Sequence, residues 1–158
     1  MPRRLLILLG VLWVLANAFV TWPATERAGD FAAFVASAVA LQRGENPYAA
    51  PDTILPDAYA PADAPGPNRN PPLLLLVFAP LASADRLAAL RALYLLSLAM
   101  YIACLAGFSR LYPAPLSTWH AALALAPLWY TLHIGQIYVF LLLPVLGAWW
   151  FFRHDQPL

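Results

Sequence analysis

The residues that could do chemistry occupy four places in an otherwise apolar chain. They are Asp30, the turn Gly44-Glu45-Asn46-Pro47-Tyr48, the segment Asn68-Arg69-Asn70-Pro71-Pro72, and Gly135-Gln136. A carboxylate such as Asp30 can act as a general base towards an acceptor hydroxyl. Arg69 can make charge-assisted contacts to a phosphate, and the ring of Tyr48 can stack on a sugar. These residue types suit proton abstraction from a hydroxyl beside a bound phosphate or sugar.

Each of these residues also has a purely structural interpretation. An aspartate directly before an apolar helical pattern, as at Asp30, is typical of an N-cap. Residues 44–48 are typical of a helix stop followed by a turn, and Tyr48 could anchor at a membrane interface. A lone Arg69 at a membrane surface could bind only lipid head groups. The amide of Gln136 must reach water or a protein partner, because an unpaired amide in hydrocarbon is costly.

Asn70 begins a different pattern, in which two prolines precede an apolar run. Proline suits the first turn of a helix, so the run beginning at Pro71 is expected to be a short helix. The unpaired N–H groups and the dipole of its first turn would attract an anionic group. Asn70 is therefore a candidate substrate contact together with Tyr48, Arg69 and Gln136, and Asp30 is the candidate catalytic residue.

Several classes of protein are excluded by what the chain lacks. It has no phosphate-binding glycine loop, no dinucleotide fingerprint, no paired histidine metal motif and no nucleophile elbow. Its single cysteine, Cys104, rules out an intrachain disulfide and a cysteine zinc site. The net charge is only +1 and the basic residues are scattered rather than clustered, which argues against nucleic acid as a partner. The sequence predicts no metal and no cofactor.

The composition indicates an integral membrane protein. Of the 158 residues, 62% are hydrophobic and 11% are charged, with a mean hydropathy of +0.66, whereas soluble domains carry about 25% charged residues. Too few polar side chains remain to cover a soluble domain, so lipid is expected to be much of the solvent. All nine basic residues are arginine, which is typical of a GC-rich bacterial genome.

The apolar runs predict an all-α polytopic fold. We expect transmembrane helices at 1–22, 85–109, 113–134 and 137–152, and a re-entrant or short membrane helix at 71–84. Pro80 should break or kink that short helix. Two alternatives stay open from the sequence, namely a full crossing by 71–84 and cleavage of 1–22 as a signal peptide.

The arginines predict the orientation of these helices, because Lys and Arg gather on the cytoplasmic side. If 71–84 does not cross, four arginines near span ends become cytoplasmic together. These are Arg3, Arg4, Arg110 and Arg153. A multi-pass protein of the inner (plasma) membrane with a cytoplasmic amino terminus is therefore expected. Asp30 and Gln136 then both lie on the outer face.

The one extended polar region is 23–70, which is expected to be an extracytoplasmic loop. Between residues 23 and 72 lie nine of the sixteen prolines and six of the eight acidic residues. Its first half predicts an amphipathic helix at about 30–43, lying on the membrane surface with Phe31, Phe34, Val35 and Ala38 on one face and Gly44 as its stop. Its second half is too rich in proline for regular structure.

The order and spacing of these motifs resemble glycosyltransferase family 87. The resemblance rests on Asp30-Phe31, on Gly44-x-Asn46-Pro47-Tyr48, on the run from Asn70-Pro71-Pro72 to Pro80-Leu81, and on Gly135-Gln136 before an apolar span. Members of that family are polytopic enzymes of the GT-C class, similar to mannosyltransferases that use polyprenyl-phosphate mannose. The resemblance covers about residues 3–153. An aromatic residue is common before the first proline of the third motif, where this chain has Asn70.

The resemblance implies transfer of a sugar from a polyprenyl-phosphate donor to the hydroxyl of a glycan or lipid acceptor, with inversion, on the outer face. The aspartate matching Asp30 would take the acceptor proton. Family members are typically more than twice as long, so this chain resembles their amino-terminal portion. The alternative from another class is a non-catalytic membrane subunit or transporter component that uses the 23–70 loop for docking. The enzyme needs Asp30, Asn70 and Gln136 to converge within about one sugar's reach on the outer face. The alternative gains if Asp30 and Gln136 face lipid or lie far apart.

Overall fold

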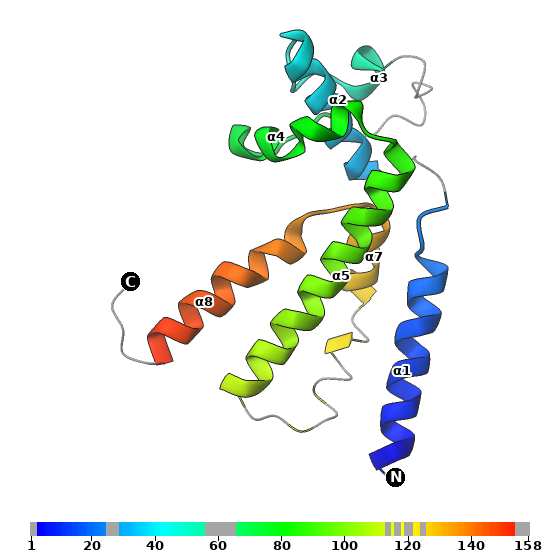
Figure 1. The fold of residues 1–158 in the computed structure, drawn as a ribbon, viewed down its shortest axis with the longest axis vertical. Coiled ribbons are helices and arrows are strands. Elements are labelled where there is room, and N and C mark those ends of the chain that lie inside the picture. The colour runs from blue at the N-terminus through cyan, green and yellow to red at the C-terminus, as the bar shows by residue number, and fades with distance from the viewer. Residues whose placement is uncertain are drawn as a thin grey trace. The chain divides into compact units, whose positions relative to one another are not determined.

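The computed structural model describes residues 3–24, 29–55, 66–112, 115, 118, 122–123 and 126–153. The helices are α1 (Arg3–Val20), α2 (Gly29–Arg43), α3 (Pro51–Ile54), α4 (Pro72–Phe78), α5 (Arg86–Leu111), α7 (Ala126–His133) and α8 (Leu142–Arg153), with 3₁₀ turns η1 (Ala79–Ser83) and η2 (Tyr138–Leu141). Figure 1 shows their course along the chain. The residues described contain no strand, so the predicted all-α class is confirmed for them.

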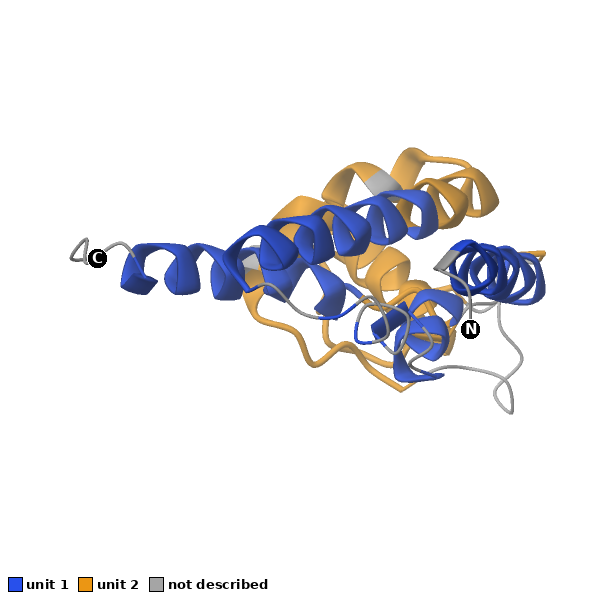
Figure 2. Cartoon of the chain, turned by 90° about the horizontal axis from the view of Figure 1, so that it is seen from below, with its two compact units in different colours: residues 1–22, 94–133, 137–158 blue, residues 23–93, 134–136 orange. Residues whose placement is uncertain are grey.

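The chain divides into two compact units, coloured separately in Figure 2. Unit 1 comprises residues 1–22, 94–133 and 137–158, and therefore holds α1, most of α5, α7 and α8. Unit 2 comprises residues 23–93 and 134–136, and holds α2, α3, α4, η1 and the first turns of α5. The short segment 134–136 thus packs with residues that precede it by about 100 positions.

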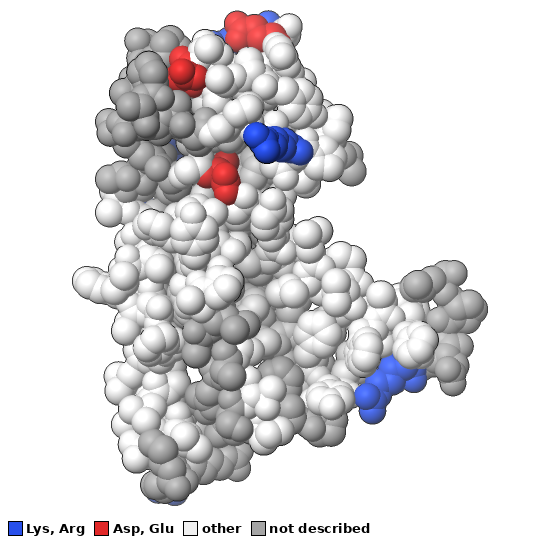
Figure 3. All heavy atoms as spheres, turned by 180° about the vertical axis from the view of Figure 1, so that it is seen from behind, with Lys and Arg blue, Asp and Glu red and all other residues white. Residues whose placement is uncertain are grey.

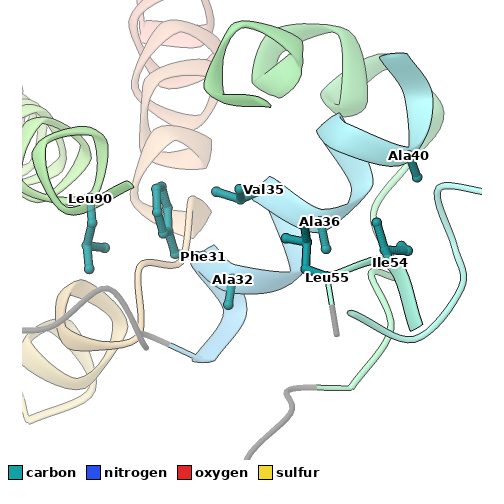
Figure 4. Packing of buried hydrophobic residues seen from close by; sticks show 8 residues of the cluster. All are labelled: Phe31, Ala32, Val35, Ala36, Ala40, Ile54, Leu55 and Leu90. Carbon is teal, nitrogen blue, oxygen red and sulfur yellow. The ribbon is translucent and has the colours of Figure 1, made fainter. Parts of the chain in front are cut away.

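Helix α2 is the centre of unit 2, since α3, α4 and η1 all pack on it. Its side chains are buried without interruption from residue 31 to residue 38. The pattern of the sequence predicts one apolar face, and the structure buries the other face as well. The reason is the size of the side chains there, because alanine and serine let neighbouring segments approach closely. Figure 4 shows how residues of α2 pack with Ile54, Leu55 and Leu90.

The end of α2 is a Schellman motif centred on Gly44. The N–H of Glu45 donates to the carbonyl of Ala40 at 2.9 Å, and the N–H of Gly44 donates to that of Leu41 at 3.2 Å. Gly44 has φ of +70°, a conformation that costs side-chain-bearing residues about 1–2 kcal/mol. The helix stop expected at this glycine is observed.

Residues 72–83 form a short helix that changes to a 3₁₀ turn. Helix α4 begins with Pro72 and ends at Phe78, directly before the 3₁₀ turn that contains Pro80. Because proline has no N–H to continue the helix, the break expected at Pro80 is observed. The rings of Phe34 and Phe78 stack with centroids 4.5 Å apart, and Gln42 donates to the carbonyl of Ala79 at 3.1 Å. These contacts fix the α4–η1 segment on α2.

In unit 1, buried aromatic side chains of α5 pack with α7. Tyr94, Tyr101 and Trp129 belong to one apolar cluster, with side chains of α1 packed against it. The hydroxyls of Tyr94 and Thr21 lie 2.8 Å apart and form a hydrogen bond, and the hydroxyl of Tyr101 donates to the carbonyl of Ala122 at 2.9 Å. Aromatic rings with one polar end can thus be buried because each hydroxyl has a partner.

Among the helices described, α5 alone is long and apolar enough to cross a membrane, with 26 residues. It begins directly after Asp85, whose carboxylate accepts the N–H of Ala88 at 2.7 Å as an N-cap. Two shorter apolar helices occupy 4–20 and 138–153. Of the span expected at 113–134, most of residues 113–125 lie outside the described part of the chain. The polytopic arrangement therefore stays a prediction.

The two units differ in which charged side chains they carry. All the acidic residues that the structure describes belong to unit 2, and on the face in Figure 3 their side chains lie over that unit. In unit 1 the charged residues within the described ranges are all arginines at helix ends. They are Arg3 and Arg4 at the start of α1, Arg110 at the end of α5, and Arg153 at the end of α8.

Candidate active site

The side chains of Asp30 and Gln136 meet in unit 2. The amide nitrogen Nε2 of Gln136 donates a hydrogen bond to Oδ2 of Asp30, across 106 positions of sequence. A second, backbone contact lies beside it, because the N–H of Phe31 donates to the carbonyl of Ile134 at 3.2 Å. The first turn of α2 is therefore joined to the 134–136 turn by one side-chain bond and one backbone bond.

Gly135 makes this junction sterically feasible. Its φ is +71°, and a Cβ built on it would lie 2.5 Å from Cβ of Phe31 and 3.1 Å from Cδ1 of Leu90. No residue with a side chain fits at the first of these distances without movement of the backbone. The glycine ends α7 and at the same time lets the turn lie directly on α2, which places Gln136 beside Asp30.

Asp30 lies in the first turn of α2 and is not its N-cap. The helix begins at Gly29, one residue earlier than the sequence pattern suggests. A carboxylate in a first turn is still stabilised by the positive end of the helix dipole. The observed side-chain partner is the amide of Gln136 and not a backbone N–H of its own helix. The capping interpretation is thereby corrected, because a partner distant in sequence holds the carboxylate.

Each polar side chain in this junction keeps one acceptor oxygen without a partner. Among the residues described, no donor reaches Oδ1 of Asp30. The carbonyl Oε1 of Gln136 is buried and has no hydrogen-bond partner in the described part of the chain. A buried acceptor without a donor costs about 1–3 kcal/mol. Asp30 is half-buried and within reach of solvent, so its Oδ1 can accept from a hydroxyl donor, whereas Oε1 of Gln136 is closed off from solvent.

Asn70 is held by a network centred on Asn68. Oδ1 of Asn68 accepts the backbone N–H of Asn70 at 2.9 Å and its side-chain amide at 2.8 Å. Nδ2 of Asn68 donates to Oγ of Ser37 at 3.0 Å, and that hydroxyl donates to the carbonyl of Pro47 at 2.6 Å. The network therefore ties the 44–48 turn and the segment before α4 to the middle of α2.

This network ties Asn70 to α2, the helix that carries Asp30, but does not bring it into contact with Asp30. Ser37 follows Asp30 by seven residues, which is about 10 Å along an α-helix. Both hydrogen bonds of Asn70 go to Asn68, and neither goes to Asp30 or Gln136. The structure therefore brings two of the predicted site residues together and places a third about two helical turns away along α2.

Tyr48 and Arg69 are both exposed on unit 2. The backbone N–H of Tyr48 donates to Oδ1 of Asn46 at 3.0 Å, an Asx turn that fixes the residue while 38% of its side chain surface stays exposed. Arg69 lies between the two asparagines of the network and its guanidinium is exposed. Neither side chain bonds to Asp30 or Gln136 in the described chain. They remain candidate contacts for the distal parts of a substrate.

Ser37 and Asn68 support the candidate site. The sequence pattern does not single out Ser37, and it offers Asn68 only as the first residue of the 68–72 segment. Both are buried, with 1% and 5% of their surface exposed. A serine within an apolar helix usually bonds to its own backbone, so Ser37 carries no signal of a distant partner. Asn68 is the residue of the two that could have drawn attention. A polar residue between Pro67 and Arg69 is expected to face water, and the structure buries it.

Replacement of Asn68 by leucine is expected to destabilise the protein by about 1–3 kcal/mol, because Ser37 and Asn70 then lose a buried partner. Thermal unfolding of the purified chain in detergent, followed by circular dichroism, measures the effect. Asn46→Ala is the matched control, because Asn46 is exposed and makes one local bond. Equal midpoints for Asn68→Leu and Asn46→Ala would contradict the supporting role of the network.

Comparison with known proteins gives one match. The model of glycosyltransferase family 87 matches residues 69–158, which include Arg69, Asn70 and Gln136, whereas Asp30 and Tyr48 precede the matched residues. No curated protein and no solved structure matches the chain. The match spans more than half of the 158 residues and contains the Gly135-Gln136 turn that carries the junction with α2. The chain therefore belongs to glycosyltransferase family 87.

Proposed function

We propose that this chain carries the acceptor-activating part of a membrane glycosyltransferase of the GT-C class. The observation that carries the proposal is the hydrogen bond from Gln136 to Asp30. It joins a residue inside the family match to the one carboxylate that the sequence singles out. The docking-loop alternative gains if these two side chains lie far apart, so their contact favours the enzyme, while Asn70 lies about two helical turns away along α2.

The proposed reaction is a direct displacement at the anomeric carbon of the sugar. The acceptor oxygen forms a bond to that carbon as the bond to the phosphate oxygen breaks, so the configuration inverts. The acceptor proton passes to Oδ1 of Asp30, and the electron pair of the broken bond leaves with polyprenyl phosphate. The donor is a polyprenyl-phosphate sugar, with mannose the expected sugar, and the acceptor is a glycan or glycolipid hydroxyl.

Gln136 has a positioning role in this scheme. Its amide N–H holds Oδ2 of Asp30, so the carboxylate cannot rotate freely and Oδ1 keeps one direction. Its carbonyl Oε1 is buried, so Gln136 acts on the acceptor through Asp30. Such orientation matters because a displacement of about 1 Å can reduce a rate by about 10²-fold.

The remaining candidate residues are proposed to bind the distal groups of the substrates. The exposed Arg69 is the cation nearest in sequence to α4, and suits the donor phosphate. The exposed ring of Tyr48 offers a stacking surface for a sugar. Asn70 is fixed by Asn68 and can present its carbonyl to a hydroxyl. No step of the proposed reaction calls for a metal or a cofactor.

The membrane placement belongs to the same proposal. With the amino terminus in the cytoplasm and the chain in the plasma membrane, unit 2 faces the extracytoplasmic side. Support comes from the apolar α5 and from the four arginines that unit 1 carries at helix ends. A cysteine introduced at Tyr48 in a Cys104→Ser background should react with a membrane-impermeant maleimide in intact cells. Labelling only after lysis would contradict this orientation.

Replacement of Gln136 by leucine is expected to lower kcat for sugar transfer by about 10–100-fold, because Asp30 loses the bond that orients it. Transfer of radiolabelled mannose from polyprenyl-phosphate mannose to membrane glycolipid measures this in vesicles that carry the chain. Gln136→Glu removes the N–H donor at similar volume and should also be slow. Gln42→Leu is the control, because it removes an exposed amide of α2 whose partner is the carbonyl of Ala79 and not Asp30. Absence of transfer by the unchanged chain would contradict the proposed function.

A further inference from the structure

Unit 1 contains an apolar groove that the proposed reaction does not use. Its volume is about 490 Å³, within the range of roughly 300–1,000 Å³ that holds small molecules. One wall is α1 between Ile7 and Leu15, and the other is α5 between Ile102 and Ser109. Every lining residue except Ser109 is apolar or glycine. An occupant must therefore present hydrocarbon along nearly the whole groove.

Two arginines lie at one end of this groove. Thr21 and Tyr94 are in contact where α1 ends and the unit 1 part of α5 begins, so the two helices run antiparallel from that point. Arg4 precedes Thr21 by seventeen residues and Arg110 follows Tyr94 by sixteen. At about 1.5 Å per residue each lies about 25 Å along its own helix from the contact. Both residues are exposed.

Ser109 places the groove next to these cations. It lines the groove and directly precedes Arg110, while Ile7 on the facing wall lies three residues after Arg4. The groove therefore runs from an apolar middle to a rim with two positive charges and one hydroxyl. The described part of unit 1 has no acidic residue that could neutralise them. The charge of the rim is complementary to an anion attached to a hydrocarbon chain.

We propose that the groove binds one acyl chain of an anionic glycerophospholipid, with the phosphate of its head group at Arg4 and Arg110. This inference rests on the membrane placement proposed above. The arginines then lie at the cytoplasmic surface, where anionic lipids attract Lys and Arg. The lipid differs from the sugar donor in place, because Asp30 and Gln136 belong to unit 2 and the groove is built from unit 1 alone.

The test is binding of dioleoyl-phosphatidylglycerol to the purified full chain in detergent, followed by native mass spectrometry without any sugar donor. Dioleoyl-phosphatidylcholine is the neutral comparison. Ala106→Trp fills the groove, and Ala103→Trp is its matched control, an exposed alanine of α5 that does not line it. Arg110→Gln removes one charge of the rim, and Arg153→Gln on α8 is the control for charge alone.

The unchanged chain should prefer the anionic lipid about 25-fold, with about fivefold from each of the two arginines. Ala106→Trp should abolish the bound lipid while Ala103→Trp keeps it, and Arg110→Gln should reduce the preference about fivefold. Ser109→Leu tests the groove again should Ala106→Trp lose helix content. Three results would each overturn the inference. The chain could bind both lipids with equal affinity, the two tryptophan variants could bind equally, or equimolar polyprenyl phosphate could displace the lipid.

The proposed lipid site and the proposed reaction can be tested independently of each other. Asp30→Asn should leave lipid binding unchanged, because Asp30 lies in unit 2 and the groove in unit 1. A chain that binds phosphatidylglycerol in the predicted way but transfers no sugar would contradict only the proposed enzymatic function. A chain that transfers sugar and has no preference for the anionic lipid would contradict only the proposed lipid site.

Discussion

Asp30→Asn is expected to lower sugar transfer by about 10²–10⁴-fold, the usual contribution of a general base. Asparagine has nearly the same shape but cannot take a proton, so the acceptor hydroxyl loses the group that activates it. The side-chain oxygen of asparagine can still accept the N–H of Gln136, which keeps the junction between α2 and the 134–136 turn. The fold of unit 2 is therefore expected to survive while the reaction does not.

Asp52→Asn is the matched control for this substitution. Asp52 is also a half-buried carboxylate in the first turn of a helix of unit 2, but it has no contact with Gln136. Both variants lose one negative charge, so a general electrostatic effect would reduce transfer equally. Transfer from polyprenyl-phosphate mannose in vesicles should fall for Asp30→Asn alone. Turnover within a few-fold of the unchanged chain would remove Asp30 as the base, whatever the behaviour of Asp52→Asn.

The identities of the two candidate site residues could be read from the sequence, but their contact could not. An acid before an apolar helix and an amide between two apolar runs are each unusual enough to be noticed. Asp30 and Gln136 are 106 positions apart, and no local pattern carries information about a pairing at that distance. The resemblance to a family supplied the expectation that they converge. The structure supplies the bond, and also the reason for it in the geometry of Gly135.

Local features of the fold were predictable where a single residue type decides them. Gly44 ends α2 because it can adopt positive φ, and Pro80 interrupts the helix before it because it lacks an N–H. The environment of α2 was not predictable in the same way. Its alanines have no strong preference for water or protein, so the sequence could not tell that they are packed on both faces.

The hydrogen-bond network around Asn68 shows a second limit to what local sequence patterns can predict. Ser37 and Asn68 have no unusual spacing, and each has an ordinary interpretation as a helix serine or a loop asparagine. Their burial comes from the fold, which brings residues 31 positions apart to within 3.0 Å. A turn motif at 44–48 and a proline motif at 70–72 look independent in the sequence. They are in fact joined through the Ser37 hydroxyl and Asn68.

Gly135→Ala is expected to be the most destabilising single-methyl change in unit 2. Positive φ alone costs about 1–2 kcal/mol for alanine. The added Cβ would also lie 2.5 Å from Cβ of Phe31, an atom that cannot move without its backbone, and such overpacking costs about 1–3 kcal/mol. The two contributions together predict a loss of about 2–5 kcal/mol. The turn is expected to move away from α2, and Gln136 with it.

Gly44→Ala separates the two contributions. Gly44 has φ of +70°, nearly the value at Gly135, but a Cβ there would meet no atom within 4 Å. Its alanine variant should lose only the conformational part, about 1–2 kcal/mol. Thermal unfolding in detergent compares the variants, and sugar transfer should fall in Gly135→Ala more than in Gly44→Ala. Equal destabilisation would mean that the close approach of Gly135 to Phe31 does not hold the turn on α2, and Gln136 would then have to reach Asp30 by another route.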